Sequence, residues 1–366
     1  MATIGIDARL TYYRDGGIST YIQEMVNALA DLDNRNNYTI FRSRKDTRQI
    51  VEQFQHLPLW TPSHHKIERL ALSAELAWRG LDIFHSPDFI PPYRGAKKHV
   101  ITVHDLTFLH YPQYLTADSR AYYNKQIANA CRHADHILAV SEATKADLVS
   151  MLNVLDTKIT VQPHGVNKRY RPLAQEKISS VLKAYNLPDS YILHVGTWEP
   201  RKNIIGLLRG YQELLSQLAD APPVVLVGRA GWLFEQTKAE IEQLGINEHI
   251  LWRDSVADED LPAIYNSAIA NVTVSHYEGF GMPTLEGMAC GTVPIVSNKS
   301  SLPEVVGDVG LLVNPDDSND IAKALYQVLT NTQWRETQSK RAIERAMQFT
   351  WRWSAEIARD TYTSLL

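Results

Sequence analysis

Short apolar runs rich in β-branched residues alternate with amphipathic helical stretches along almost the whole chain. The runs have the length and composition of strands buried on both faces, and the helical stretches repeat apolar residues at i, i+3 and i+4. The first half contains strand-like runs at 3–8, 38–42, 82–85, 100–104, 136–140 and 158–161, and helical stretches at 19–32, 119–133 and 142–152.

The second half repeats this order. Its strand-like runs lie at 191–195, 224–227, 250–252, 270–274, 293–296 and 310–313, and its helical stretches at 203–218, 232–244, 261–267, 284–290, 319–330 and 334–347. Alternating βα units, present twice, predict an α/β fold with two doubly wound, Rossmann-like parallel sheets. A length of 366 residues also favours two domains, at about 150 residues each. The turn-rich segment 163–172 places their boundary near residue 168, so that 169–349 forms the second domain and 350–366 a separate amphipathic helix.

Composition excludes several classes of protein. A formal net charge of −4 argues against a protein that coats nucleic acid. No run of 18 apolar residues occurs, and the N-terminus lacks the regions of a signal peptide. Two cysteines cannot build a disulfide framework or a cysteine metal cluster. We therefore expect a soluble, cytoplasmic protein that binds no nucleic acid and no metal.

Charge is distributed unevenly between the halves. Residues 1–183 hold 23 basic and 18 acidic side chains, whereas 184–366 hold 14 and 23. A basic first half can face an anionic partner such as a phospholipid surface or a phosphorylated acceptor. Ordinary variation in composition between two domains explains the same numbers.

The segment 277–286 holds the densest set of chemical features. A strand is expected to end here in a glycine-rich loop, and Pro283 stands where the first turn of a helix should begin. Gly279 and Gly281 allow the backbone to approach a ligand, and the first helical amides can bind an anion or a hydroxyl group. Glu278 and Glu286 bracket the turn, so both can face one ligand. The alternative is a plain strand–helix connection with two surface glutamates.

Two further segments follow predicted strands. Arg201 and Lys202 are adjacent at the start of a helix, where a forked and a compact cation suit a diphosphate. Gly16 and Gly17 precede the first helix and can wrap phosphate or sugar oxygens, although no dinucleotide fingerprint is present. Ligands of open α/β sheets bind at the carboxyl ends of strands, which favours a functional interpretation of Arg201 and Lys202 over a solvated basic pair. A simple structural turn explains Gly16 and Gly17 equally well.

Other candidate residues can be explained by structural roles alone. His104 ends a strand and can donate a hydrogen bond or move a proton, but a histidine in this place is often structural. The histidines at 133 and 136 straddle a helix end and are unsuited to zinc. The acidic run 258–260 has the Asp-x-Asp form of a metal–nucleotide motif, but we interpret it as acidic capping of a helix start.

Taken in order, these segments resemble the retaining glycosyltransferases of family 4, which have the GT-B fold. Glu278 and Glu286 match the E-x7-E signature, and 195–203 is similar to the Arg-Lys motif. The match continues at 288–296 and 301–307. In the first domain, the family's motifs correspond to segments 15–17, 104–105 and 163–166. In 163–167, His and Asn replace the usual Asn and Asp, and 252–255 lacks the glycine usual near the nucleobase.

The resemblance implies two domains facing a cleft, with the C-terminal helix crossing back to the first. Residues 1–168 with 350–366 would face the acceptor, and 169–349 would bind a nucleoside diphosphate sugar without a metal or other cofactor. Arg201 and Lys202 would neutralise the diphosphate, Glu286 would hold the ribose, and Glu278 the sugar hydroxyls. The remaining donor contacts would come from Gly16, Gly17, Gly279, Phe280, Gly281, Met282 and Pro283, with His104 at the sugar ring.

Segments 5–9 and 102–108 look most like the mannosyltransferases of polysaccharide and O-antigen synthesis. This favours mannose from GDP-mannose, passed to a saccharide or lipid-linked acceptor, with glucose and N-acetylglucosamine left open. The other candidate functions are a GT-B nucleotide-sugar epimerase, which needs no acceptor, and a non-catalytic nucleotide-sugar-binding protein.

Residues 64–80 suggest a peripheral membrane contact. Lys66, Arg69 and Arg79 surround an apolar set that could lie on an anionic surface: Ile67, Leu70, Ala71, Ala74 and Trp78. The alternative is a helix packed on its own domain with its basic residues in solvent.

Overall fold

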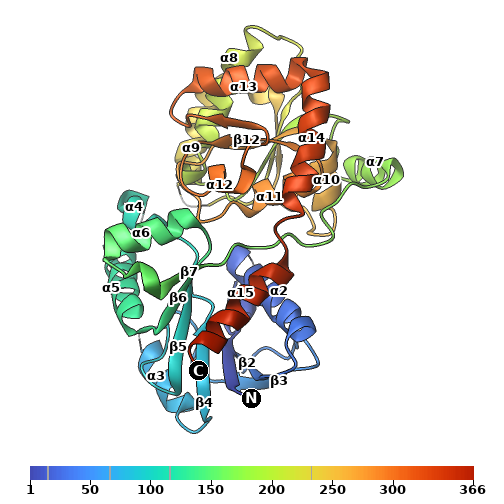
Figure 1. Ribbon diagram of the computed structural model, residues 1–366. Coiled ribbons are helices and arrows are strands. Elements are labelled where there is room, and N and C mark those ends of the chain that lie inside the picture. Colours follow the sequence, from blue (N-terminus) through green and yellow to red (C-terminus); the bar gives the residue numbers. More distant parts are fainter. Residues whose placement is uncertain (15, 66, 115–116, 232) are drawn as a thin grey trace. The chain divides into compact units, whose positions relative to one another are not determined.

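The computed structural model describes residues 1–14, 16–65, 67–114, 117–231 and 233–366, which form two compact units. The first unit combines Met1–Gly165 with Thr350–Leu366, and the second is Val166–Phe349 (Figure 1). The sequence-based boundary at residue 168 lies just beyond this division. Each unit is described below by itself.

The first unit is built on a seven-stranded parallel sheet of order β3-β2-β1-β4-β5-β6-β7. Its strands are β1 (Thr3–Asp7), β2 (Asn37–Ser43), β3 (Gln55–Leu59), β4 (Leu81–Ser86), β5 (Ala96–Val103), β6 (His136–Ala139) and β7 (Ile159–Val161). Only β3 is missing from the sequence-based expectation. It is an edge strand that contains Pro58 and no β-branched residue, so its apolar pattern is weak.

Helices cover both faces of this sheet, as a doubly wound fold requires. They are α1 (Leu10–Tyr13), α2 (Gly17–Leu32), α3 (Glu68–Leu76), α4 (Thr107–His110), α5 (Ala117–His133) and α6 (Glu142–Leu152), with short 3-10 turns at Pro112–Tyr114 and Asp156–Lys158. Helix α6 shows how local sequence sets such limits. The Ser141 hydroxyl accepts a hydrogen bond from the Thr144 amide at its start, and Asn153 ends it in the left-handed conformation.

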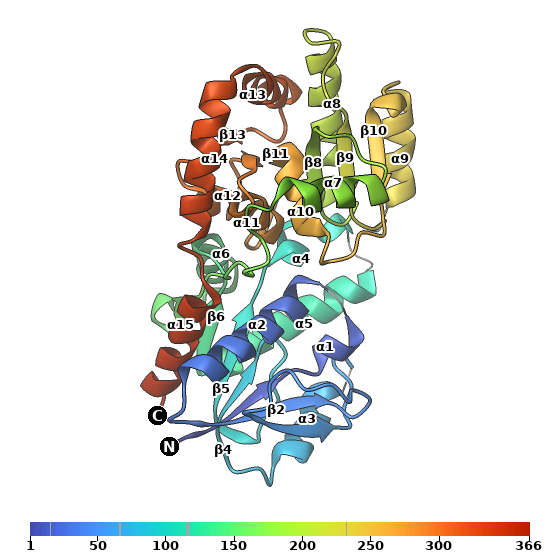
Figure 2. The same cartoon turned by 90° about the vertical axis from the view of Figure 1, so that its right-hand side faces the viewer.

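The C-terminal helix α15 (Trp351–Ser364) belongs to the first unit and lies beside α2 (Figures 1 and 2). The Gln162 side-chain amide donates to the Ser354 carbonyl at 2.9 Å, and the hydroxyl of Tyr362 lies 2.7 Å from Nδ1 of His85. Gly165 passes so close that a Cβ there would lie 2.1 Å from the Trp351 nitrogen. These contacts confirm that the last helix crosses back to the first domain.

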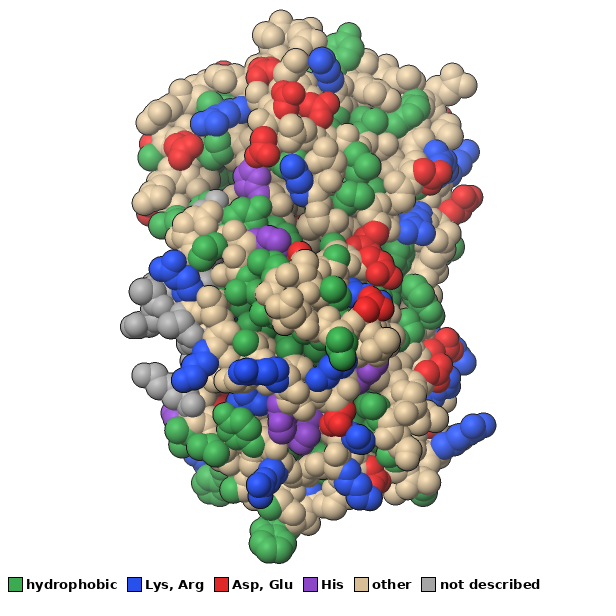
Figure 3. Space-filling view, turned by 60° about the vertical axis from the view of Figure 1, so that its left-hand side comes forward, with side chains coloured by type: hydrophobic (Ala, Val, Ile, Leu, Met, Phe, Trp, Pro, Cys, Tyr) green, Lys and Arg blue, Asp and Glu red, His purple; other side chains and the backbone are tan. Residues whose placement is uncertain are grey.

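Helix α3 corrects one expectation about the segment 64–80. Leu72 and Leu76 pack into the core, but Arg69 is buried as well, and its Nε donates to the Pro91 carbonyl at 2.9 Å. Arg69 therefore does not face solvent, because it is part of the domain's own packing. Lys66 lies outside the described residues. Figure 3 shows Lys and Arg side chains among hydrophobic ones toward the lower end of one face.

The second unit has a six-stranded parallel sheet of order β10-β9-β8-β11-β12-β13. Its strands are β8 (Tyr191–Val195), β9 (Val224–Val227), β10 (Ile250–Arg253), β11 (Ala268–Thr273), β12 (Val293–Ser297) and β13 (Leu311–Val313). Each coincides with an expected run to within a few residues. The buried Val- and Ile-rich composition of parallel strands explains why these were predictable.

The helices of this unit are α7 (Gln175–Ala184), α8 (Ile204–Leu215), α9 (Phe234–Gln243), α10 (Leu261–Ser267), α11 (Met282–Ala289), α12 (Leu302–Val306), α13 (Ser318–Thr330) and α14 (Thr332–Ala346). Short 3-10 turns occur at Pro200–Lys202 and Asn247–His249. The expectation for 232–244 begins at residue 232, which lies outside the described residues. Helices α7 and α12 were not expected.

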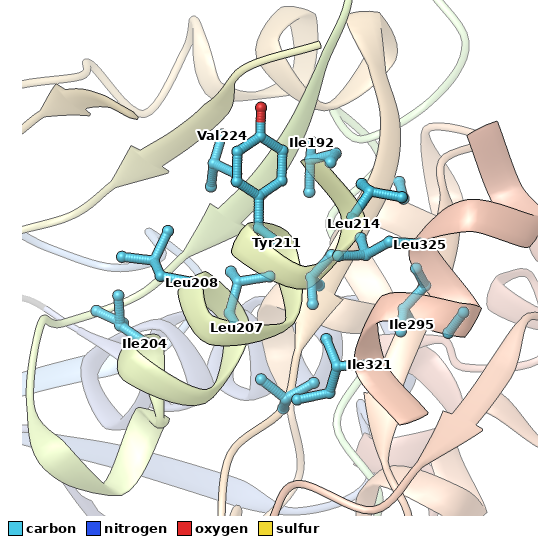
Figure 4. Packing of buried hydrophobic residues seen from close by; sticks show 14 of the residues in the cluster. Ile192, Ile204, Leu207, Leu208, Tyr211, Leu214, Val224, Ile295, Ile321 and Leu325 are labelled. Atoms are coloured by element: carbon cyan, nitrogen blue, oxygen red, sulfur yellow. The ribbon is translucent and has the colours of Figure 1, made fainter. Parts of the chain in front are cut away.

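Helix α8 anchors the turn that carries Arg201 and Lys202. Leu207, Leu208 and Leu214 are fully buried in the core that α8 forms with α13 (Figure 4). Each such side chain contributes about 1.5–3 kcal/mol of hydrophobic stabilisation. At the helix start, Asn203 takes a left-handed conformation (φ 55°) and its side chain accepts from the Gly206 amide. Its side-chain amide also donates to the carbonyls of Val274 and Pro315, so the turn is fixed to the loop after β11.

Candidate active site

The strand order of the second sheet reverses between β8 and β11, and loops at such a switch point form the usual ligand site of a doubly wound fold. The loop after β8 leads to Arg201 and Lys202, and the loop after β11 leads to Glu278. The His276 amide donates to the Arg201 carbonyl at 2.9 Å, which joins the two loops directly. The two strongest sequence motifs therefore meet at one edge of one sheet.

Arg201, Lys202 and Glu278 form an ion cluster in which Glu278 is buried and the two cations are partly buried. Nη1 of Arg201 lies 3.0 Å from Oε2 of Glu278, and Nζ of Lys202 lies 2.7 Å from Oε1. Nη1 of Arg201 also donates to the Tyr277 carbonyl at 2.6 Å, while its Nη2 donates to Glu199 at 2.7 Å. Charged hydrogen bonds of this kind are the stronger ones in proteins, so the three side chains hold one another in position.

Glu278 is ionised in this setting. Burial raises the pKa of its carboxyl group, but the charges of Lys202 and Arg201 outweigh that effect and lower the pKa to about 2. The Ser275 hydroxyl also donates to Oε1 at 2.7 Å. The backbone of Glu278 is fixed too, because its amide donates to the Ser300 hydroxyl and its carbonyl accepts from that of Ser301.

Helix α11 begins directly after the glycine-rich loop. Gly281 is the N-cap residue with φ of 96°, a conformation that favours glycine, and a Cβ there would lie 2.6 Å from Cδ2 of Leu302. Pro283 occupies the first turn, as expected. The helix starts two residues before the expected range because the left-handed Gly281 already turns the chain into helical geometry.

This early start changes the position of Glu286. It is the fifth helical residue and so lies in the second turn, whereas the expected helix start at residue 284 would place it in the first. Its Oε2 accepts from the Tyr265 hydroxyl at 3.1 Å. Burial raises the pKa of Glu286 to about 7, against the lowering effect of hydrogen bonds from Tyr265 and Tyr170. Glu278 and Glu286 thus occupy separate environments with opposite preferences for a proton.

The remaining candidates belong to the first unit. Gly16 has φ of 143° and Gly17 begins α2, and a Cβ at either position would meet no atom within 4 Å. Packing therefore does not demand glycine at either position, but the backbone conformation of Gly16 favours it. Nε2 of His104 lies 2.8 Å from the Pro87 carbonyl, and burial lowers the pKa of the ring, so it is neutral at pH 7. Asp15 lies outside the described residues.

Several residues of the site were not anticipated. Ser275 precedes Glu278 by three positions and follows the end of β11 by two, so a polar residue directly after a buried strand could have indicated it. Tyr170 and Tyr265 come from distant segments of the chain. Nothing in the sequence around either tyrosine indicates that it lies beside Glu286. His194 is buried at the end of β8, where burial and the Lys202 charge lower its pKa to about 4.

Other sequence expectations concern metals and membranes. Among the residues that the structure describes, no group of three or more His, Cys, Asp and Glu side chains is arranged to hold a metal ion. Asp260 stands at the N-cap of α10, but its side chain makes no capping hydrogen bond and instead accepts from the Tyr185 hydroxyl at 3.0 Å. No helix in the described ranges is long and apolar enough to cross a bilayer.

Comparison with known proteins agrees with this geometry. The family described as glycosyl transferases group 1 matches residues 178–345, and glycosyltransferase family 4 matches residues 15–170. The chain belongs to these glycosyltransferases and is an enzyme of the hexosyltransferase class.

Individual relatives have more specific names than the family models. O-antigen chain mannosyltransferase B of Escherichia coli is 36% identical over 270 residues, which is 74% of this chain and 71% of that protein. A serotype-specific mannosyltransferase of Escherichia coli is 30% identical over 283 residues, or 76% of this chain but 35% of its own length.

Solved structures show the same fold at lower identity. A sucrose-phosphate synthase from Thermosynechococcus elongatus matches with a TM-score of 0.79 and 21% identity, covering 100% of this chain and 99% of that one. A glycosyltransferase involved in lipopolysaccharide biosynthesis matches with a TM-score of 0.76 and 15% identity, over 98% and 99%. The expected GT-B fold is confirmed.

Proposed function

We propose that this enzyme transfers mannose from GDP-mannose to a saccharide or lipid-linked acceptor, with retention of the anomeric configuration and without a metal ion. The observation that carries the proposal is the cluster of Arg201, Lys202 and Glu278 beside the start of α11. The names of the two relatives, an O-antigen chain mannosyltransferase and a serotype-specific mannosyltransferase, support mannose over other hexoses.

Leaving-group stabilisation follows from the two cations. When the bond between sugar and diphosphate breaks, negative charge grows on the phosphate oxygens. Arg201 and Lys202 are fixed beforehand by Glu278 and Glu199, so they can neutralise this charge with little rearrangement. Two protein cations at the diphosphate supply the charge that a divalent metal provides in other enzymes, which is why we propose metal independence.

The two glutamates would serve different parts of the donor. Glu278, ionised and beside the cations, would hold the hydroxyls of the transferred sugar and stabilise positive charge at its ring. Glu286, eight residues further on, would bind the ribose hydroxyls. The amides of Gly279 to Met282 would contact sugar or phosphate oxygens. Gly16, Gly17 and His104 would add contacts from the first unit.

A donor screen tests the proposal. The melting temperature of the enzyme should rise most with GDP-mannose among a set of UDP-, GDP- and dTDP-sugars, because a ligand that binds only the folded state stabilises it. Mannose should then appear in an added acceptor. Conversion of the donor without an acceptor would favour an epimerase, and binding without turnover would favour a non-catalytic protein.

We also propose that the enzyme works as a peripheral protein at the inner face of the membrane. Four large hydrophobic side chains project from α3 and its flanking loops: Trp60 is 72% exposed, Ile67 57%, Leu70 65% and Trp78 94%. Ile67, Leu70 and Trp78 recur with helical spacing on one side, and Arg44 stacks over Trp60 at 4.4 Å. We call these four residues the hydrophobic patch. Aromatic and aliphatic side chains beside cations suit an anionic lipid surface.

A further inference from the structure

A cavity of about 240 Å³ lies in the first unit, and its lining contains none of the residues assigned to the donor. Liquid water occupies roughly 30 Å³ per molecule, so the space would hold about eight waters. The cavity opens between α2 and the β2–β3 end of the sheet. Its lining includes Gln23 and Asn27 of α2, Arg42 of β2, His56 of β3, and Asp46, Arg48 and Gln49 of the connecting loop.

The sheet explains why polar groups converge there. Along β2, Ile40 and Arg42 alternate with residues of the opposite face of the sheet, and Ile40 is paired with His56 in the register of β2 and β3. These three side chains therefore share one face of the sheet. Gln23 and Asn27 are four residues apart on α2, so they face the same cavity from the opposite wall.

Arg42 has an unusual environment for a guanidinium group. Its Nε is buried and has no hydrogen-bond partner. A buried donor left in this state is costly, and such a group in a folded protein calls for an explanation by a ligand, ion or water. Among the described residues, no hydrogen bond joins Arg42 to the neighbouring Asp46, whose oxygens accept from Arg48, although the Arg42 charge helps to lower the pKa of Asp46.

His56 supplies a hydrogen-bond acceptor to the cavity, whereas Arg42 supplies a donor. Its Nε2 lies 2.9 Å from the Val51 carbonyl, a contact that requires Nε2 to carry the proton. Burial, with a contribution from the Arg42 charge, lowers the pKa of the ring, so the neutral tautomer has an unprotonated Nδ1. This Nδ1 is also buried without a partner, and it can only accept a hydrogen bond.

Charge completes the description of the ligand. The cavity holds two arginines and one aspartate, and the neutral His56 leaves a net formal charge of +1. The amides of Gln23, Asn27 and Gln49 can bind hydroxyl groups. We propose that this cavity is a second binding site, which takes a hydroxylated anion of monosaccharide size, such as a sugar phosphate. Arg42 contacts the anionic group and His56 Nδ1 accepts from a ligand hydroxyl.

The test is calorimetric titration of the full chain. Arg201→Ala and Lys202→Ala are introduced first, so that the donor site cannot capture the probe and the result is independent of the proposed function. Mannose 6-phosphate should bind saturably at one site. Glucuronate shows whether a carboxylate can replace the phosphate. Mannose shows whether the negative charge is needed. Arg42→Met should weaken mannose 6-phosphate at least tenfold, whereas Arg44→Met, with the same loss of charge outside the cavity, should not.

Two further variants separate recognition from folding. His56→Phe should weaken mannose 6-phosphate but leave inorganic phosphate unchanged, because only the sugar ring places a hydroxyl beyond the anionic group, where His56 can accept from it. Arg42→Met should keep or raise the melting temperature without ligand, since its buried Nε has no partner to lose. Absence of saturable binding by both anions, equal affinity in the Arg42 and Arg44 variants, or a large fall in the melting temperature of Arg42→Met would each overturn the proposal.

Discussion

Glu278 and Glu286 carry the same carboxyl group in one short segment, yet their neighbours give them different protonation states. Two cations keep Glu278 ionised, whereas Glu286 sits among tyrosines and burial raises its pKa to about 7. The sequence predicted both residues as ligand contacts but not this difference, because Tyr170 and Tyr265 are remote in the chain. The Arg201–Glu278 pair was within reach of prediction, since both residues follow strands that end at one sheet edge.

Kinetics of two variants test the division of roles. Glu278→Gln should lower kcat at saturating donor by about 10²–10³, because it removes stabilisation of charge that develops in the transition state. Glu286→Ala should mainly raise the donor KM, by roughly tenfold, because ribose contacts change little during the reaction. A Glu278→Gln enzyme with full kcat and only a weaker KM would contradict this division.

The pKa of Glu286 also predicts a pH effect on stability. A pKa raised to about 7 means that the folded protein binds this proton more tightly than the unfolded chain. The contribution to stability is therefore present below pH 4.5 and is lost as the pH rises to about 7, by up to roughly 3 kcal/mol. Glu286→Gln should thus be more stable than the parent at pH 8, relative to pH 5, in thermal unfolding. An identical pH profile in both proteins would exclude the effect.

At the scale of elements, the burial of a strand or helix largely determines whether it could be predicted from the sequence. Strands such as β9 and β12 consist mainly of buried Val, Leu and Ile residues, and they are evident from sequence. The short α12 contains Pro303 and is too brief to show a periodic pattern. Helix α7 does repeat buried apolar residues at i, i+3 and i+4 (Ile178, Val181 and Leu182), so it was within reach of prediction although it was not expected. The burial of Arg69 depends on the Pro91 carbonyl and the Tyr93 ring, which only the folded domain brings to it.

Docking of α15 depends on Gly165. A Cβ at this position would lie 2.1 Å from the backbone of Trp351, so Gly165→Ala must displace the helix. We expect a loss of about 2 kcal/mol or more, seen as a melting temperature lower by roughly 4–8 °C. Gly17→Ala is the matched control, since its Cβ would meet nothing within 4 Å. Equal melting temperatures for the two variants would show that this close contact does not limit stability.

The hydrophobic patch predicts lipid binding by one element. Leu70→Ser with Trp78→Ser should reduce flotation with vesicles that contain acidic lipid, and wild type should float less with neutral vesicles. Leu312→Ser, at a residue of the second unit that is 47% exposed, is the control. Flotation that is independent of acidic lipid, or unchanged in the double variant, would leave α3 as a helix that only packs on its own domain.

At the scale of the whole molecule, repeated βα order predicted two doubly wound sheets, and the C-terminal return to the first unit followed from the family resemblance. Membership in the glycosyltransferases joins these features to hexosyl transfer. The central claim concerns how such an enzyme stabilises its leaving group. In our account, Arg201 and Lys202 do so without help from a metal ion.

The most direct measurement is the initial rate of mannose transfer from GDP-mannose to a manno-oligosaccharide in the presence of EDTA. The wild-type rate should be unchanged by EDTA, and Arg201→Ala should lower it by about 10²–10³, because its charge acts on the leaving diphosphate. Asp258→Ala should stay near the wild-type rate, since Asp258 is 84% exposed and belongs to the acidic run before α10. Loss of activity in EDTA with recovery in magnesium or manganese, or an Arg201→Ala enzyme as active as Asp258→Ala, would contradict the account.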